Sequence, residues 1–172
     1  MMYARRIRAA ISAISAVSLA LAAFALLGFA RIAAAADQVP FHGRLVGVVT
    51  RGVANPPFVP VLIEGVGNAS HLGRFTFSAP HTVNLATRTA EGTYEFTAAN
   101  GDMLFADFVG QSYPTDTPGV VYIVEEATIT GGTGRFAGAT GSFTVERLYD
   151  TVAGTTIGTF EGTISSGGAR KR

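Results

Sequence analysis

The sequence predicts an all-β domain of eight or nine antiparallel strands, closed into a barrel and preceded by a segment for export. Two observations predict the fold. From residue 39 onward, short stretches of alternating or β-branched residues recur without helical periodicity. Gly, Pro and Asn-Gly separate these stretches at short intervals, which leaves no room for crossover helices. Closure removes the exposed edges of such a sheet, and a β-sandwich is the alternative that the pattern fits nearly as well.

Residues 1–36 have the layout of a secretory signal peptide. Three arginines precede residue 9, residues 9–30 carry no charge, and Ala34-Ala35-Ala36 supplies the small residues that signal peptidases recognise. We therefore expect cleavage after Ala36 and export of a bacterial protein to the periplasm or the exterior, by the general or the twin-arginine route. Roughly 20 apolar residues exceed a typical signal core, so an uncleaved membrane anchor is the alternative.

The charge of the domain is acidic once its two ends are set apart. The whole chain has 13 basic and 12 acidic residues. Residues 37–166, the expected barrel, keep six of the basic and all of the acidic ones, and residues 167–172 form a flexible basic tail. An acidic body is a poor match for phosphate backbones, so no nucleic-acid partner is expected. The chain has no cysteine, which excludes disulfides, thiolate metal sites and thiol nucleophiles.

In the first half of the domain, strands are expected at residues 41–51, 58–66, 72–79 and 82–89. The third alternates cleanly, with Phe75 and Phe77 on one face and polar residues on the other. Pro80 has no backbone N–H, so it is expected to end or bend this strand before the fourth begins.

In the second half, strands are expected at residues 93–98, 103–111, 120–130, 140–149 and 155–165. Asn100-Gly101 between the first two is the strongest hairpin signal in the chain, because Asn-Gly supplies the positive φ angles of a tight turn. Short connections throughout favour an antiparallel meander.

A glycine-rich segment separates the strands expected at 120–130 and 140–149. The residues expected to form this structural turn are Gly131, Gly132, Gly134, Phe136, Gly138 and Gly141. Glycine permits backbone angles that a residue with a Cβ resists, and Phe136 is expected to re-enter the core. A Gly-rich loop can also bind phosphate, but no helix and no Lys follow here, so a corner of the barrel is the favoured interpretation.

The same segment, residues 129–141 (Ile-Thr-Gly-Gly-Thr-Gly-Arg-Phe-Ala-Gly-Ala-Thr-Gly), resembles a signature of plant dirigent proteins and allene oxide cyclases. Residues 121–125 and 158–163 are similar to neighbouring strands of that superfamily. Residues 71–75 and 97–102 resemble small exported bacterial members. The resemblance implies an eight-stranded antiparallel barrel that forms a homo-oligomer, a dimer or trimer. The family's catalytic residues lie outside the well-matched segment, so none is carried over.

Glu125 and Asp107 are the candidates for a catalytic carboxylate. Adjacent strand residues face opposite sides of a sheet, so either Glu125 or Glu126 faces inward. Glu125 shares the parity of the apolar residues in its strand, so we expect it inside, where burial raises a carboxyl pKa unless the group is paired. An ion pair with Arg147 or Arg74 is the alternative to a catalytic role. Asp107 lies in a run that is apolar on both faces.

The candidates for contact with a ligand are Phe75, Phe77, Phe105, Tyr122 and Glu125. The histidines, His42, His71 and His81, lack the helical i, i+4 spacing of zinc ligands, so no metal site is expected. No cofactor fingerprint occurs in the sequence, so no cofactor is expected.

Three functions remain open from the sequence, with a non-enzymatic role favoured. The favoured hypothesis is a barrel that binds or steers a small apolar molecule. The second is an allene oxide cyclase-like cyclase or isomerase that uses an inward carboxylate. The third is a structural or interaction role for a barrel packed solid by Phe and Val. What fills the interior distinguishes the three.

Overall fold

The computed structural model describes residues 37–165. The predicted signal segment and basic tail lie outside this range, so export stays a prediction. The strands are β1 (Gln38–Arg51), β2 (Phe58–Ala69), β3 (Gly73–Asn84), β4 (Thr89–Ala98), β5 (Met103–Pro114), β6 (Val120–Gly132), β7 (Gly141–Asp150) and β8 (Thr155–Ser165). A single 3-10 turn, η1 (Gly134–Phe136), lies between β6 and β7. Within residues 37–165 no helix is long and apolar enough to cross a membrane.

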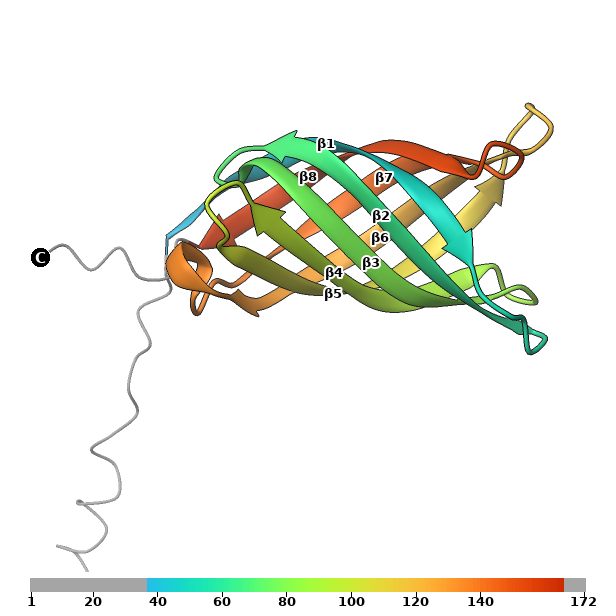
Figure 1. Cartoon of the computed structure of the whole chain (residues 1–172), viewed down its shortest axis with the longest axis horizontal. Helices are drawn as coiled ribbons and strands as arrows, with labels where there is room; N and C mark the ends of the chain where they lie inside the picture. The colour runs from blue at the N-terminus through green and yellow to red at the C-terminus, as the bar shows by residue number, and fades with distance from the viewer. Residues whose placement is uncertain (1–36, 166–172) are drawn as a thin grey trace, which may run out of the picture. The chain divides into compact units, whose positions relative to one another are not determined.

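The eight strands form one closed antiparallel barrel in which every strand pairs with its neighbours in the chain (Figure 1). The seam between β1 and β8 is paired from Gln38↔Ser165 to Val48↔Thr155. The barrel prediction is therefore confirmed and the β-sandwich alternative is wrong. The β1–β2, β3–β4, β5–β6 and β7–β8 connections lie at one end, here called the mouth, and the other three lie at the opposite end, the base (Figure 1).

Pro80 does not divide the chain into two strands as the sequence predicted. It lies within β3, opposite Leu62 of β2. Pairing with β4 is interrupted between Ser78↔Glu95 and His81↔Gly92, where the proline has no N–H to offer, and resumes in the same register. The strand expected at 82–89 is thus the end of β3, followed by a turn in which Arg88 has a φ of 60°. Of the eight or nine strands that the sequence predicted, the structure has eight, because the third and fourth expected stretches belong to one strand.

The Asn100-Gly101 hairpin joins β4 to β5 as predicted, but with a different turn. The Gly101 amide donates to the Ala98 carbonyl, and the Ala98 amide donates to the Asp102 carbonyl. Only Gly101 has a positive φ, of 86°, whereas a type I′ turn needs two such residues. Asn100 instead donates from its side chain to Asp102, at 2.8 Å.

Inward-facing aromatic side chains fill the half of the barrel toward the base. The members of this aromatic cluster are Phe41, Phe75, Phe77, Tyr94, Phe96, Phe108, Phe143 and Phe160, all buried. Their rings lie close together, as in Phe41–Phe160 (5.0 Å between centroids) and Tyr94–Phe108 (4.8 Å). Phe136 of η1 is also buried and covers the base. Such packing supplies the hydrophobic core that a domain without disulfides needs.

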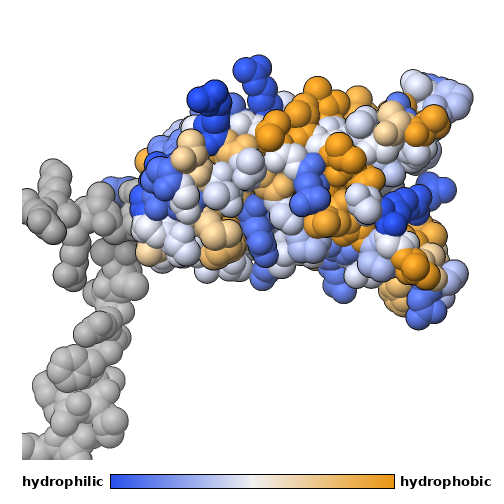
Figure 2. Space-filling view, viewed as in Figure 1, coloured by the Kyte–Doolittle hydropathy of each residue, from blue (hydrophilic) through white to orange (hydrophobic). Residues whose placement is uncertain are grey.

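The outer surface carries apolar side chains as well. Figure 2 shows hydrophobic residues gathered on the half of the barrel toward the mouth. Val46 is about half exposed and lies opposite Val66 of β2 and Ile157 of β8, which are also exposed. Cross-strand apolar pairs of this kind stabilise a sheet even on a solvated face.

Candidate functional site

A polar layer crosses the barrel interior directly above the aromatic cluster. Glu125 of β6 is fully buried and faces inward. Arg147 of β7 donates to it from Nη2 to Oε1 at 2.6 Å and from Nε to both carboxylate oxygens at 3.1 Å. The Tyr94 hydroxyl donates to Oε2 at 2.5 Å. Arg147 Nη1 also reaches Thr156 Oγ1 at 3.4 Å, and Thr156 donates to the Leu148 carbonyl at 2.8 Å.

The electrostatics of this layer follow from burial and from the ion pair. Burial lowers the pKa of Arg147, but the Glu125 carboxylate outweighs it and the pKa is raised overall. Burial raises the pKa of Tyr94 well above its usual value, and the neighbouring Glu125 charge adds to this. Tyr94 therefore stays a neutral donor and Arg147 stays charged at neutral pH. Between residues 37 and 165, no buried side-chain N or O atom lacks a hydrogen-bond partner.

His81 adds an imidazole to the same level of the barrel. Its Nδ1 lies 2.9 Å from the Ala79 carbonyl, which can only accept, so Nδ1 carries the proton when the ring is neutral. Burial lowers the pKa of His81, with Arg147 acting in the same direction, against the opposing effects of the Ala79 hydrogen bond and Glu125. The neutral form has its lone pair on Nε2. Nε2 makes no hydrogen bond within the described residues. Because no buried side-chain nitrogen there lacks a hydrogen-bond partner, Nε2 is not fully buried and is accessible to a ligand.

Glycines on neighbouring strands provide the room for these large polar side chains. In the strand register, His81 lies opposite Gly92, Glu125 opposite Gly110, and Arg147 opposite Gly158. A Cβ at Gly158 would lie 2.5 Å from Arg147 Cβ, and one at Gly110 would lie 2.8 Å from Glu125 Cγ. Each of these large polar side chains therefore passes over a glycine of the adjacent strand, where no Cβ blocks it.

A cavity of about 180 Å³ lies between the polar layer and the mouth. Its walls are mainly aliphatic, with His81 and Arg147 among the lining residues. The other lining residues are Val49, Arg51, Val61, Ile63, Val83, Leu85, Arg88, Thr89, Ala90, Gly110, Gln111, Ser112, Val121, Ile123, Tyr149 and Thr151. Leu85, Arg88 and Thr151 belong to mouth connections, which places the opening of the cavity at that end. The barrel is thus solid toward the base and hollow toward the mouth.

The sequence candidates for a site do not line this cavity. Phe75 and Phe77 face inward but belong to the aromatic cluster. Asp107 is exposed on the outer face of β5, and Phe105 and Tyr122 are half-buried on the outer faces of β5 and β6. This corrects the placement of these three residues. For Asp107 and Phe105 the reason is that β5 is apolar on both faces, so its sequence does not reveal which side chains face inward. Tyr122 has the opposite parity to Glu125 in β6, so the inward position of Glu125 places Tyr122 outside.

Glu125 has the inward position that its parity predicted, and it pairs with Arg147, one of the two partners considered. It does not line the cavity, because Arg147 and Tyr94 occupy its oxygens. His81 and Arg147 are site residues that the sequence did not predict. The available signal for His81 was its parity with Phe75 and Phe77, which the expected break at Pro80 concealed.

The middle of the glycine-rich segment, from Gly134 through Phe136 to Gly138, forms the corner at the base, whereas Gly131 and Gly132 belong to β6 and Gly141 to β7. Gly134 has a φ of 54°, and a Cβ there would collide with the Asp102 carboxylate. Asp102 Oδ2 accepts from the Arg135 amide at 3.3 Å and lies 3.8 Å from Arg135 Nε. The Asn100 amide and the Arg135 backbone N–H lower the pKa of Asp102. These contacts tie η1 to the β4–β5 hairpin, and Phe136 packs into the core beneath it.

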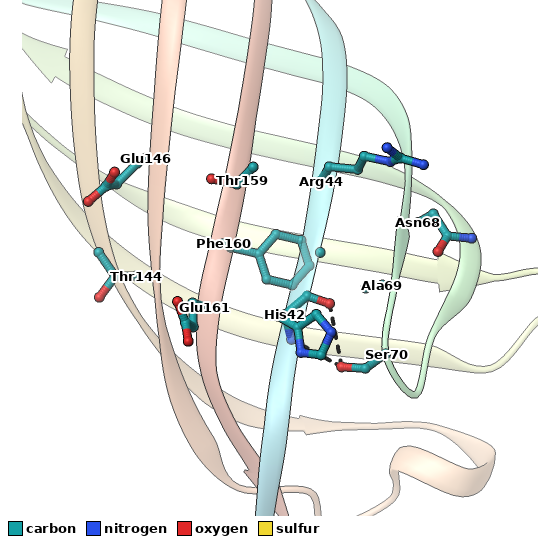
Figure 3. A pocket seen from close by; sticks show the side chains of 11 residues that line it. His42, Arg44, Asn68, Ala69, Ser70, Thr144, Glu146, Thr159, Phe160 and Glu161 are labelled. Carbon is teal, nitrogen blue, oxygen red and sulfur yellow. Dashed lines mark hydrogen bonds between the residues drawn. The ribbon is translucent and has the colours of Figure 1, made fainter.

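A second hollow lies on the outer surface, across β1, β2, β7 and β8 (Figure 3). In it Glu161 lies opposite His42 in the β1–β8 ladder, but neither Glu161 nor Glu146 forms an ion pair with His42 (Figure 3). The His42 amide donates to Ser70 Oγ at 3.0 Å, which fastens the β2–β3 connection to β1. Across the described part of the chain, no group of three His, Asp or Glu side chains could hold a metal ion.

Comparison with known proteins gives a likeness in fold. No protein-family model matches the sequence, and a search of curated proteins finds no match. Among solved structures, the chain is similar to a pterocarpan synthase dirigent protein, with a TM-score of 0.48 and 18% identity over 79% of this chain and 89% of that chain. At this identity the likeness does not extend to what the chain binds.

Proposed function

We propose that the protein binds a small, mainly apolar molecule in the cavity at the barrel mouth. The observation that carries the proposal is a cavity of about 180 Å³ with aliphatic walls over a polar floor. An apolar protein cavity of about 150 Å³ holds a benzene molecule, so the cavity at the mouth fits a group the size of one aromatic ring. Larger ligands would extend through the mouth.

The floor supports binding rather than acid–base chemistry by Glu125. The carboxylate is fully buried and is occupied by Tyr94 and Arg147. At the floor of the cavity, the polar groups that a ligand meets are His81 Nε2, an acceptor, and the N–H groups of Arg147 that Glu125 and Thr156 do not use. A few placed polar groups in an apolar pocket are typical of sites that orient a ligand.

The test is an NMR titration of the protein with benzyl alcohol, which pairs one ring with a hydroxyl donor. We expect saturable shifts at His81 and at the aliphatic residues of the cavity. Val83→Phe fills the cavity and should abolish the shifts, while Val66→Phe on the outer surface should leave them unchanged. Binding that survives Val83→Phe, or no binding at all by the wild-type protein, would contradict the proposal.

Native mass spectrometry of the protein from its own host provides an independent test. A co-purifying small molecule that is retained by wild type and lost in Val83→Phe would identify the ligand class. A molecule retained by both would bind elsewhere and would weaken the assignment to this cavity.

A further inference from the structure

The distribution of charge around the mouth cavity is opposite to that of the barrel as a whole. Between residues 37 and 165 the chain has six arginines, no lysine and twelve acidic residues. Three of the six arginines line the cavity: Arg51, Arg88 and Arg147. None of the twelve acidic side chains does. Arginines scattered for solubility alone would not gather at one hollow of an acidic protein, so the cavity is a positive site within a negative surface.

Two of these arginines have no ion-pair partner in the barrel. Within the described residues, the salt bridges are Arg135–Asp102 and Arg147–Glu125. Arg147 is therefore balanced by Glu125, whereas Arg51 and Arg88 at the rim keep their full charge. Both residues line the cavity, so a ligand in it lies within reach of their side chains.

The backbone holds Arg88 at the rim. It has a φ of 60°, a left-handed conformation that is uncommon for a residue with a Cβ. Its carbonyl accepts from the Gln111 side chain at 3.1 Å and from the Ser112 amide at 2.9 Å. These contacts fix the β3–β4 connection against β5, so the rim position of Arg88 is part of the folded structure.

We propose that the ligand of this cavity is a small carboxylic acid whose body is the size of one aromatic ring. The inference rests on the proposed binding function and names the ligand class. The body occupies the aliphatic walls, and the carboxylate lies at the rim between Arg51 and Arg88. Guanidinium groups match carboxylates in geometry as well as in charge, and this pair has no competing carboxylate among the lining residues.

Three probes with the same phenyl ring and three-carbon chain but different charge test the inference by calorimetry: 3-phenylpropanoate, its neutral amide 3-phenylpropanamide, and the cationic 3-phenylpropylamine. We expect the acid to bind about tenfold more tightly than the amide at low salt, and the amine to bind most weakly. Exposed ion pairs are worth up to about 1 kcal/mol each, so Arg51→Gln and Arg88→Asn should each weaken acid binding about two- to fivefold. Asn tolerates the left-handed backbone of position 88. Neither variant should change amide binding, and Arg74→Gln on the outer face of β3 is the control.

The outcomes separate this inference from the function on which it rests. If acid and amide bind equally, or if the arginine variants leave acid binding unchanged, the ligand class is wrong and the binding site stands. Tighter binding of the amine would also overturn the ligand class. If none of the three probes binds and benzyl alcohol does not bind either, the binding function itself fails.

Discussion

Glu125 and Arg147 show how a buried charge is accommodated in an aromatic and aliphatic interior. Each ion would be costly to bury alone, and the pair is tolerated because five contacts satisfy it: three from Arg147 to Glu125, one from Tyr94 and one to Thr156. The stability of the fold is therefore sensitive to mutation of either residue of the pair. Loss of one partner leaves the other charge buried without compensation.

Glu125→Gln is expected to destabilise the protein strongly. The amide cannot balance Arg147, so we expect a loss of about 3–5 kcal/mol in the free energy of unfolding at pH 7, measured by urea denaturation. Glu126→Gln alters the adjacent residue on the exposed face and should change stability by less than about 0.5 kcal/mol. Similar effects of the two variants would show that the ion pair is not needed for stability.

His81 is expected to make stability depend on pH. Its pKa is lowered from 6.5 in the folded protein, so below that pH the unfolded chain binds more protons than the folded one. Stability from the neutral imidazole is thus lost as the pH falls from 6.5 toward the folded pKa. The difference in unfolding free energy between wild type and His81→Gln should shrink over this range. The same comparison for His42→Gln, on the outer surface, is the control, and a constant difference for His81→Gln would refute the expectation.

At the scale of the structural elements, residues of complementary size lie opposite each other on neighbouring strands. The inward glycines of β4, β5 and β8 lie opposite the three large polar residues of β3, β6 and β7. The same rule holds in the aromatic cluster, where Gly65 and Gly67 of β2 lie opposite Phe77 and Phe75. Glycine weakens an isolated strand, and here the loss is offset by the large side chain that covers it.

Gly158→Ala tests this arrangement. The added methyl group would lie 2.5 Å from Arg147 Cβ and from the Glu146 carbonyl, and neither can move without separating β7 from β8. We expect a loss of about 1–3 kcal/mol in unfolding free energy, despite the better strand propensity of alanine. Thr159→Ala, on the opposite face of β8, is the matched control. A Gly158→Ala protein as stable as the control would mean that the strands adjust freely.

The predictability of each strand from the sequence depended on the contrast between its two faces. The strand expected at 155–165 has the observed bounds, because alternation there is clear and turns flank it. In β5, apolar side chains on both faces left the parity of Asp107 and Phe105 open. At Pro80 a local rule predicted a break, but the β2 ladder holds the strand together through the proline. The site depends on this continuity of β3, because His81 directly follows Pro80 and lines the cavity. The cavity itself could not be predicted, because no local sequence pattern shows where the packed aromatic side chains end and an open space begins.

For the whole molecule, closure gives every strand two partners. The β1–β8 seam joins the two ends of the domain with a continuous ladder from Gln38 to Val48. An open sheet would expose these two strands as edges. The dimer or trimer that the resemblance implies stays a prediction. Because the barrel is closed, such an oligomer would have to form through side chains on the outer surface and not by pairing of strand edges.

Native-state hydrogen exchange is expected to report this closure. Amides of β1 and β8 in the seam should be protected as strongly as those at the β3–β4 and β5–β6 interfaces, and all should exchange by global unfolding. The mouth connections should exchange faster. Markedly faster exchange along β1 and β8 alone would indicate that the seam opens before the rest of the barrel.

The size pairing across strands also has an evolutionary consequence. A mutation that enlarges Gly92, Gly110 or Gly158 is tolerated only when the residue opposite becomes small, so each pair must change together. Positions 81 and 92, 110 and 125, and 147 and 158 would then covary among descendants of this barrel, although each pair is separated by 11 to 15 residues in the chain. In a lineage that replaced the three large polar residues with small ones, positions 92, 110 and 158 would no longer be restricted to glycine.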